Sequence, residues 1–299
     1  MISADDPCAK AFFRLFWELN PQETLAWLSE HPELLAEGWA HLSVNRSGLD
    51  QDGLPIHTVQ GEQVLAIDAY QQTLLVRVKG TGYRGVLAIC KDPARLSLQP
   101  SDQAGVMGQQ AGGIARDHNG LIGFTGSGFI DEGGHGKGGE ITGFALCGGK
   151  SYGTHFGSGY KRIELRQDHR LYVTDAPGEV SAQATDAMEF KPALIVDGNI
   201  VVDETCGWTA VNPRACLGQS ARLEILMLAI EGRQTASLGT DVIVCAEILA
   251  QHDCMQAMNM DGGTSAMLWY DGAPVIRCSN SKLPEGRYLP NAWVIERRG

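Results

Sequence analysis

The sequence predicts an α+β fold in which mixed, largely antiparallel β-sheets carry flanking helices, preceded by a small helical N-terminal segment. Most of the 299-residue chain consists of short apolar runs separated by turn residues, with few helical patterns between them. Helical periodicity is clear only near the N-terminus and in one later segment. The Asp197-Gly198 step between two apolar runs is typical of a β-hairpin turn.

Residues 1–55 are predicted to form the helical segment, and residues 56–299 the main domain. Aromatic and leucine residues recur at helical spacing from Phe12 to Leu19, and Asn20-Pro21 ends that pattern. A further apolar face runs through Leu25, Leu28, Leu34 and Leu35. The turn-rich stretch NRSGLDQDG, residues 45–53, indicates a linker. We expect this segment to cap the main domain or to dock a partner.

The main domain contains the predicted strands, which are rich in β-branched and apolar residues. These runs are QTLLVRVKG (72–80), YRGVLAICKDP (83–93), KRIELRQDHRLYVT (161–174), PALIVDGNIVVD (192–203), LEILMLAIEG (223–232) and PNAWVIERR (290–298). A helix is predicted over Asp241 to His252, where Val242, Ala246 and Leu249 share a face. The stretch CMQAMNMDGG (254–263) is predicted to be a buried strand that ends in Asn259 and Asp261.

The composition restricts the possible partners. The net charge is −11, which argues against nucleic acid or an anionic membrane, because both require clustered Lys and Arg. No segment is long and apolar enough to span a bilayer, and no secretory signal is recognisable, so we expect a cytoplasmic protein, with a secreted or particle-associated protein as the alternative. The eight cysteines form no metal-binding pattern and are expected to be mostly buried free thiols. We expect no cofactor and no metal, and the sequence leaves a homo-oligomer open.

Three glycine-dense segments are the candidates for chemistry, because glycine lets the backbone turn tightly or approach a ligand closely. They span residues 123–144, 207–239 and 254–272. Simple surface loops are the alternative interpretation. The pattern disfavours a phosphate-binding P-loop, since Lys137 is followed by Gly138 and not by Ser or Thr. It also disfavours a dinucleotide-binding fingerprint, since no βαβ pattern surrounds the glycines.

Four ordered motifs carry a resemblance to a known family. They are NPRACLG (212–218), EGRQTASLG (231–239), NMDGGTSAM (259–267) and EGRYLPNAWVI (285–295), with SGFIDEGGHGKGG (127–139) upstream. In this order they resemble the phosphodiester glycosidase family, over roughly Leu74 to Ile295. The chain departs from the family pattern at Thr125, where Asn is frequent, at Glu231 in place of Asp, at Lys191 in place of Gly, and at Cys216 and Ala266.

The resemblance implies a hydrolase that cleaves a sugar-1-phosphodiester, such as one of N-acetylglucosamine, into free sugar and a phosphomonoester. It implies that Asp261 is the base or nucleophile and Glu285 the second carboxylate. Arg214 and Arg287 are the expected phosphate clamp, since their planar guanidinium groups suit phosphate. The expected substrate-binding residues are Asn259, Ser127 and Thr264, which would contact sugar hydroxyls or phosphate oxygens, and Gly128, Gly262 and Gly263, which would admit close backbone contacts.

Several assignments stay open at this point. Asp131, Glu132 and His135 could share the pocket, with His135 as a proton shuttle, or they could bind a hard cation, although their spacing is not that of a known calcium loop. Arg233 is either a phosphate ligand or a surface ion pair, and Glu285 and Arg287 could form a structural pair. Two other functions compete with hydrolysis: a non-catalytic glycan- or phosphate-binding module, and a phosphodiesterase for a nucleotide-type small molecule.

Overall fold

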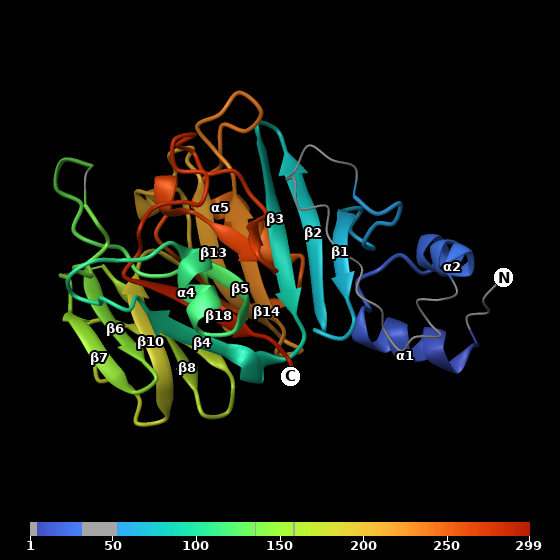
Figure 1. Cartoon of the computed structure of the whole chain (residues 1–299), viewed down its shortest axis with the longest axis horizontal. Coiled ribbons are helices and arrows are strands. Elements are labelled where there is room, and N and C mark those ends of the chain that lie inside the picture. Colours follow the sequence, from blue (N-terminus) through green and yellow to red (C-terminus); the bar gives the residue numbers. More distant parts are fainter. Residues whose placement is uncertain (1–4, 32–52, 135, 158) are drawn as a thin grey trace.

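The computed structural model describes residues 5–31, 53–134, 136–157 and 159–299. Within these ranges the chain is an α+β protein with three β-sheets whose strand pairs are all antiparallel, which confirms the predicted fold class (Figure 1). The α-helices are α1 (Pro7–Leu15), α2 (Pro21–Glu30), α4 (Ala111–Asp117) and α5 (Val242–Ala250). Short 3-10 turns occur at Pro93–Arg95, Glu132–Gly134, Glu204–Cys206 and Gly263–Ser265.

An eight-stranded sheet forms the centre of the molecule. Its order is β1 (Gln63–Asp68), β2 (Thr73–Gly80), β3 (Tyr83–Cys90), β14 (Ile225–Ile230), β13 (Arg214–Ser220), β15 (Cys254–Asn259), β11 (Ala193–Val196) and β12 (Asn199–Ile200). Successive side chains of a strand point to opposite sides of the sheet. The middle strands are buried on both faces because each face packs in a hydrophobic core. In β14, for example, Met227 joins one hydrophobic core and Leu228 joins the other.

Two five-stranded sheets share the first of these cores with the central sheet. One has the order β7 (Lys150–Thr154), β6 (Gly143–Cys147), β10 (Ala184–Phe190), β8 (Lys161–Arg166) and β9 (Leu171–Asp175). The other has the order β17 (Ala273–Pro274), β16 (Leu268–Tyr270), β5 (Gly120–Thr125), β18 (Asn291–Glu296) and β4 (Leu96–Pro100). Helix α4 packs on β5 and β18 through Ala111 and Ile114.

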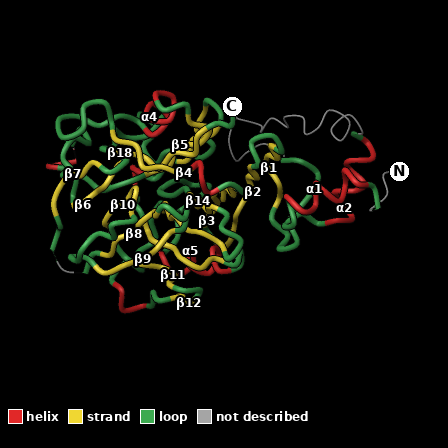
Figure 2. Tube along the Cα trace, turned by 90° about the horizontal axis from the view of Figure 1, so that it is seen from below, coloured by secondary structure: helices red, strands yellow, loops and turns green. Residues whose placement is uncertain are grey.

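Helices α1, α2 and α5 contribute to the second core, on the other face of the central sheet. Helix α5 starts where the Asp241 carboxylate accepts hydrogen bonds from two backbone N–H groups, and it ends two residues before the predicted His252. Phe16 and Leu28 pack in the same core as Val64 of β1. Figures 1 and 2 both show α1 and α2 beyond β1, at the end of the molecule opposite β6 and β7. The predicted helix residues Leu34 and Leu35, and most of the 45–53 linker, lie outside the described residues.

The chain reversals of the central sheet decide which motifs meet. The predicted turn at Asp197-Gly198 is confirmed: it joins β11 to β12, and its two residues have φ values of 50° and 77°, as a type I′ turn requires. The apolar stretch between Arg214 and Arg233 forms the β13–β14 hairpin, whose second strand corresponds to the predicted run 223–232. Arg214 therefore pairs with Ile230, and both ends of the stretch lie at the same end of the two strands.

Candidate active site

The motifs that carry the family resemblance meet at one end of the central sheet. Strand β15 pairs with β13 so that Asn259 lies opposite Cys216. Just beyond the strand ends, the Met260 N–H donates to the Ala215 carbonyl at 2.8 Å and the Gly263 N–H donates to the Pro213 carbonyl at 3.0 Å. The NPRACLG and NMDGGTSAM motifs are thus held together by backbone hydrogen bonds, which fix the position of the turn that follows Asp261.

The third sheet brings two more motifs to the same place. Ser127, just after β5, is bonded twice to the Asn291 amide at the start of β18: its N–H donates at 2.8 Å, and its hydroxyl accepts at 2.9 Å. The Gly126 carbonyl accepts from the Asp261 N–H at 3.4 Å. Gly126 must be glycine, since a Cβ there would lie 2.2 Å from the Asn291 side-chain oxygen. The ends of strands β5, β15 and β18 therefore meet at a common junction.

Asp261 lies at this junction, half-buried and closely surrounded by protein. Burial raises the pKa of its carboxyl from 3.8 to about 6, because the charged form loses hydration. Hydrogen bonds from the Ser265 side chain and the Gly262 backbone, and the positive charge of Arg287, oppose this rise but do not cancel it. A carboxylate of this kind is a stronger base near neutral pH than an exposed aspartate.

Arg287 links Asp261 to a second carboxylate, that of Asp131. Its guanidinium donates to both Asp131 oxygens, at 2.6 and 2.8 Å, and to the Gly136 carbonyl at 3.1 Å. The guanidinium also lies 4.6 Å from the centre of the Phe129 ring, a cation–π distance. The Asp131 charge contributes to the raised pKa of Asp261 and to a raised pKa of Arg287. Asp261, Arg287 and Asp131 therefore form one electrostatic unit.

Tyr160 is a member of this neighbourhood that the sequence analysis missed. Its hydroxyl hydrogen-bonds with Thr142, and burial together with the charges of Asp261 and Glu189 raises its pKa. Its ring meets the edge of Phe190 at 6.0 Å, and Lys191 lies 5.2 Å from the ring centre. No motif signals this tyrosine, because only the fold brings the segment after β7 to the Asp261 turn.

Several predicted ligands have protein partners in the structure. Arg214 is buried and donates to three backbone carbonyls, those of Thr240, Trp208 and Ala210, at 3.1, 2.9 and 2.5 Å. This bonding argues against Arg214 as a phosphate clamp, and it gives the arginine a role in holding the loop before β13. Strand register explains the orientation, since Arg214 pairs with Ile230, which faces the core on the α5 side.

Asn259 and Ser127 are also engaged in holding the fold. The buried Asn259 amide donates to the Lys191 carbonyl at 2.9 Å, and Ser127 is bonded to Asn291 as described above. Thr264 contacts Ser279 through its hydroxyl at 3.1 Å. Asn259 and Ser127 therefore support the turn in this structure, and their predicted contact with substrate stays a prediction.

The second predicted carboxylate also differs in its setting. Glu285 is exposed, and it is not among the groups that shift the pKa of Asp261, whereas Asp131 is. Asp131, and not Glu285, therefore belongs to the group of charges around Asp261 and Arg287. Glu132 is exposed as well, and His135, which was predicted to share the pocket with Asp131 and Glu132, lies outside the described residues.

The predicted glycines and Arg233 lie around the same turn. Gly263 has a φ of 61°, and a Cβ there would lie 3.2 Å from the Arg233 guanidinium, so glycine is required both by the backbone and by this close approach. At Gly128 the space is filled by Thr142 and Phe190 and not by a ligand. A Cβ at Gly262 would lie 3.0 Å from the Pro213 carbonyl oxygen. Arg233 is exposed and donates to the Asn212 side chain at 2.9 Å.

Two departures from the family pattern lie outside the catalytic groups. Thr125 is buried; its hydroxyl donates to the Ser265 carbonyl at 2.7 Å and accepts from the Met267 N–H at 2.8 Å. Glu231 is buried and accepts from Arg84 at 2.9 Å. Both side chains therefore have structural partners in this chain.

Comparison with known proteins identifies the family of this chain. A family model described as phosphodiester glycosidase matches residues 119–296. The chain belongs to the phosphodiester glycosidase family. The match covers the Asp261 turn and the segments that carry Asp131, Arg233 and Arg287. No curated protein matches this family member at a significant level.

Solved structures share the fold of this phosphodiester glycosidase family member. One is the zebrafish N-acetylglucosamine-1-phosphodiester α-N-acetylglucosaminidase catalytic domain, auto-inhibited by its pro-peptide, at 18% identity and a TM-score of 0.61, covering 76% of this chain and 82% of that chain. A hypothetical protein from Synechocystis aligns at 13% identity and a TM-score of 0.53, covering 79% of this chain and 64% of that chain. A putative exported protein from Burkholderia pseudomallei aligns at 15% identity and a TM-score of 0.53, covering 91% and 89%.

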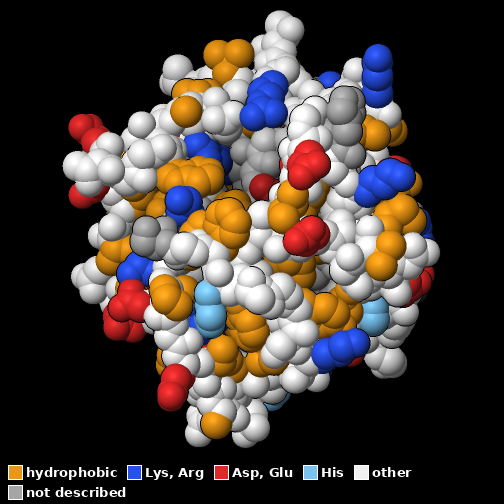
Figure 3. All heavy atoms as spheres, turned by 90° about the vertical axis from the view of Figure 1, so that its left-hand side faces the viewer, with side chains coloured by type: hydrophobic (Ala, Val, Ile, Leu, Met, Phe, Trp, Pro, Cys, Tyr) orange, Lys and Arg blue, Asp and Glu red, His pale blue; other side chains and the backbone are white. Residues whose placement is uncertain are grey.

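The surface at the end of the molecule that carries β6 and β7 is hollowed near its middle, and acidic and basic side chains border the hollow (Figure 3).

Among the residues that the structure describes, no three His, Cys, Asp or Glu side chains are grouped so as to hold a metal ion. In the same part of the chain, no helix has the length and hydropathy needed to cross a membrane.

Proposed function

We propose that this phosphodiester glycosidase hydrolyses a sugar-1-phosphodiester, with N-acetylglucosamine as the first sugar to test. The observation that carries the proposal is the Asp261 carboxyl, whose pKa of about 6 suits a base or nucleophile at neutral pH, next to the Arg287 cation. The family membership and the N-acetylglucosamine-1-phosphodiester named for the zebrafish structure support the choice of substrate.

In the proposed reaction water, or Asp261 followed by water, attacks the anomeric carbon of the sugar. The bond between that carbon and the bridging phosphate oxygen breaks, and its electron pair stays on the phosphate, which leaves as a phosphomonoester. When water attacks directly, Asp261 takes its proton. When Asp261 attacks first, water then displaces the Asp261 carboxylate from the anomeric carbon, and the released carboxylate takes the proton of that water. The leaving phosphate is a weak base, so it needs charge stabilisation more than proton donation, and this favours a nearby guanidinium over a strong acid.

Arg287 is the proposed phosphate ligand, and Asp131 is the proposed second carboxylate. Asp131 holds the Arg287 guanidinium through two charge-assisted hydrogen bonds, which fixes its orientation. Two carboxylates with different surroundings can take different roles: burial raises the pKa of Asp261 to about 6, while Asp131 is paired with Arg287 through both of its oxygens.

The test is a panel of synthetic sugar-1-phosphodiesters incubated with the wild-type protein and with Asp261→Asn, scoring free reducing sugar. We expect turnover by the wild type, and a loss of about 1,000-fold or more in the variant, typical of removing a catalytic group that acts in the transition state. Thermal unfolding of both proteins shows whether the variant is folded. Saturable binding of the panel without any product would support the non-catalytic binding module instead.

We also propose a cytoplasmic location. All eight cysteines are free thiols and six of them are buried, which is usual for a protein kept in a reducing compartment. Thiol titration of the denatured protein, isolated from its native cells with alkylation at lysis, tests this: eight titratable thiols agree with the proposal, and fewer would point to disulfides formed in an oxidising compartment.

A further inference from the structure

Lys191 carries a positive charge beside the catalytic turn that the proposed reaction does not use. It is half-buried and lies between β10 and β11, where the chain passes from one five-stranded sheet to the central sheet. Its ammonium lies 5.2 Å from the centre of the Tyr160 ring, a cation–π distance. Among the residues that the structure describes, no carboxylate pairs with this ammonium. On a chain with a net charge of −11, such a cation is a candidate ligand for an anion.

Glu189, a carboxylate whose charge acts on Tyr160, has partners other than Lys191. It is fully buried on β10. Its side-chain oxygen contacts the His155 ring nitrogen at 2.5 Å and accepts from the Arg162 guanidinium at 3.4 Å. The Lys191 charge is therefore not needed to compensate the buried Glu189 carboxylate.

Hydrogen bonds connect the Lys191 backbone to the strand that leads to Asp261. The Lys191 carbonyl accepts from the Asn259 side-chain amide at 2.9 Å, and the next carbonyl, that of Pro192, accepts from the Asn259 N–H at 3.1 Å. Asn259 precedes Asp261 by two residues. The segment that carries Lys191 is thus fixed next to the catalytic turn.

A second series of hydrogen bonds connects Tyr160 to the same turn. The Tyr160 hydroxyl bonds with Thr142, and the Thr142 N–H donates to the Gly128 carbonyl at 3.0 Å. Two residues earlier, the Gly126 carbonyl accepts from the Asp261 N–H at 3.4 Å. The charge of Asp261 also contributes to the raised pKa of Tyr160. Tyr160 is therefore near both the Lys191 ammonium and the Asp261 carboxylate.

Asp261 belongs to two separate groups of side chains, because it acts on both Arg287 and Tyr160. The other carboxylate that acts on Arg287 is Asp131. The other one that acts on Tyr160 is Glu189. We call these groups the Arg287 side and the Tyr160 side of Asp261.

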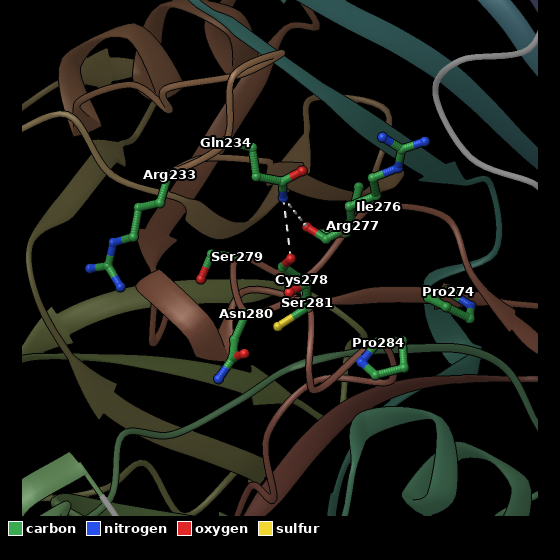
Figure 4. Close-up of a pocket in the computed structure, with 10 residues that line it drawn as sticks. All are labelled: Arg233, Gln234, Pro274, Ile276, Arg277, Cys278, Ser279, Asn280, Ser281 and Pro284. Atoms are coloured by element: carbon green, nitrogen blue, oxygen red, sulfur yellow. Dashed lines mark hydrogen bonds between the residues drawn. The ribbon is translucent and has the colours of Figure 1, made fainter.

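The Arg287 side has open space of its own. A pocket of about 590 Å³ lies there, within the range of roughly 300–1,000 Å³ found for small-molecule sites. Figure 4 shows its lining residues, which come from the turn after β14 and from the segment after β17. The Arg287 charge acts on Cys278 of this lining, and the Ser279 hydroxyl donates to Thr264 of the catalytic turn at 3.1 Å. With the phosphate bound by Arg287, the group that it carries has room on this side, and the sugar faces the Tyr160 side.

The Tyr160 side also has an exposed aromatic side chain. Phe156 is 50% exposed, and its ring centre lies 5.4 Å from that of Tyr160. Both residues follow β7, which lies at the end of the molecule whose surface is hollowed (Figures 1 and 3). Small-molecule sites are lined by aromatic side chains with a few polar or charged groups that set the orientation of the ligand. An exposed ring near the Lys191 ammonium suits a ligand that has an apolar face and a negative charge.

We propose that the Tyr160 side binds the sugar, and that Lys191 selects a sugar that carries a carboxylate, as a uronic acid does. This inference rests on the proposed function, because it takes the phosphate to be bound by Arg287. The sugar ring then lies against the aromatic side chains, and its carboxylate pairs with the Lys191 ammonium.

Two substrates that differ only at C6 of the sugar test the proposal. One is the N-acetylglucosamine-1-phosphate ester of methanol, and the other is the same ester with a carboxylate in place of the C6 hydroxymethyl group. We expect wild-type kcat/KM to be about tenfold higher for the carboxylate substrate, the size of one charge-assisted contact. Lys191→Gln should bring the ratio close to one, and Lys191→Arg should retain part of the preference.

Lys150→Gln is the matched control. Lys150 is exposed on β7, and its ammonium lies 5.2 Å from the centre of the Tyr152 ring, the same distance as in the pair of Lys191 and Tyr160. This variant should keep the wild-type ratio. A preference that Lys191→Gln leaves unchanged, or that both variants reduce equally, would show that Lys191 does not select the sugar.

Binding of non-cleavable analogues separates this inference from the proposed function. In these analogues of the two substrates a methylene group replaces the bridging oxygen, so no glycosidic bond is present to break. Calorimetry should give a tighter wild-type Kd for the carboxylate analogue, by about tenfold, and Lys191→Gln should remove the difference. If this holds but neither ester is hydrolysed, the role of Lys191 stands and the proposed function fails. If both esters are hydrolysed with equal efficiency and both analogues bind equally, the proposed function stands and the inference about Lys191 is wrong.

Discussion

Replacing Asp261 by Asn should stabilise the protein at neutral pH while it removes catalysis. Burial raises the pKa of the Asp261 carboxyl from 3.8 to about 6, so the folded state holds this proton more tightly than the unfolded state does. The unfolding free energy therefore falls as the pH rises from 3.8 to about 6. In this range the unfolded protein has already lost the proton, and folding must either take up a proton or bury the charged carboxylate. Asparagine resembles the neutral carboxyl and carries no such cost.

The magnitude follows from the size of the shift. A rise from 3.8 to about 6 is about two pKa units, and at roughly 1.4 kcal/mol per unit it corresponds to about 3 kcal/mol at pH 7. Because Asp261 is only half-buried, we expect the gain in the unfolding free energy of Asp261→Asn to be about 1–3 kcal/mol at pH 7. At pH 4 and below, where the carboxyl is protonated in the folded protein, the gain should fall to near zero.

The assay is urea unfolding of wild type and variant between pH 4 and 8, with the difference in unfolding free energy plotted against pH. Asp102→Asn, which removes an exposed carboxylate, is the control for the change in net charge. The difference should grow as pH rises from about 4 to 6 and then level off. A variant that is less stable than wild type at pH 7, or a difference that does not change with pH, would refute the reasoning about the buried carboxyl.

Three further outcomes follow from the site. The kcat/KM of the wild type should rise with pH and level off above about 6, because Asp261 acts in its charged form; an activity that instead falls through pH 6 would assign it the role of an acid. Thr125→Val should lower the unfolding free energy by about 1–3 kcal/mol in urea unfolding, since the hydroxyl bridges two backbone groups. The folded variant should keep most of the wild-type activity. Arg214→Met should lower the unfolding free energy by about 2–4 kcal/mol, because three hydrogen bonds to carbonyls are lost. A variant that keeps the wild-type stability and differs only in KM would contradict the structural role of Arg214.

The parts of the fold that could be predicted from the sequence are those with local signals. The Asp197-Gly198 turn is predictable because both residue types tolerate positive φ, and helix α5 because Asp241 caps it. Strand β5 and helix α4 were missed, since each contains two glycines and so has a weak local preference. Packing accounts for them: a Cβ at Gly123 would lie 2.5 Å from the Ala111 carbonyl, so glycine allows α4 to lie close on β5.

For the candidate site, the motifs predicted which segments meet but not which side chains face the turn. That orientation depends on strand register, which the sequence does not reveal. Arg214 and Asn259 face the α5 side because they pair with Ile230 and Cys216, both in the core on that side. Tyr160 could not be found by motif, since its proximity to Asp261 results from the packing of separate sheets.

The position of the bond that breaks tests the proposed glycosidase chemistry most directly. Hydrolysis of a sugar-1-phosphodiester in water enriched in oxygen-18, followed by mass spectrometry of both products, shows which product receives the solvent oxygen. Attack at the anomeric carbon predicts oxygen-18 in the free sugar and none in the phosphomonoester. Label in the phosphate product would mean that phosphorus is attacked, and the protein would then be a phosphodiesterase.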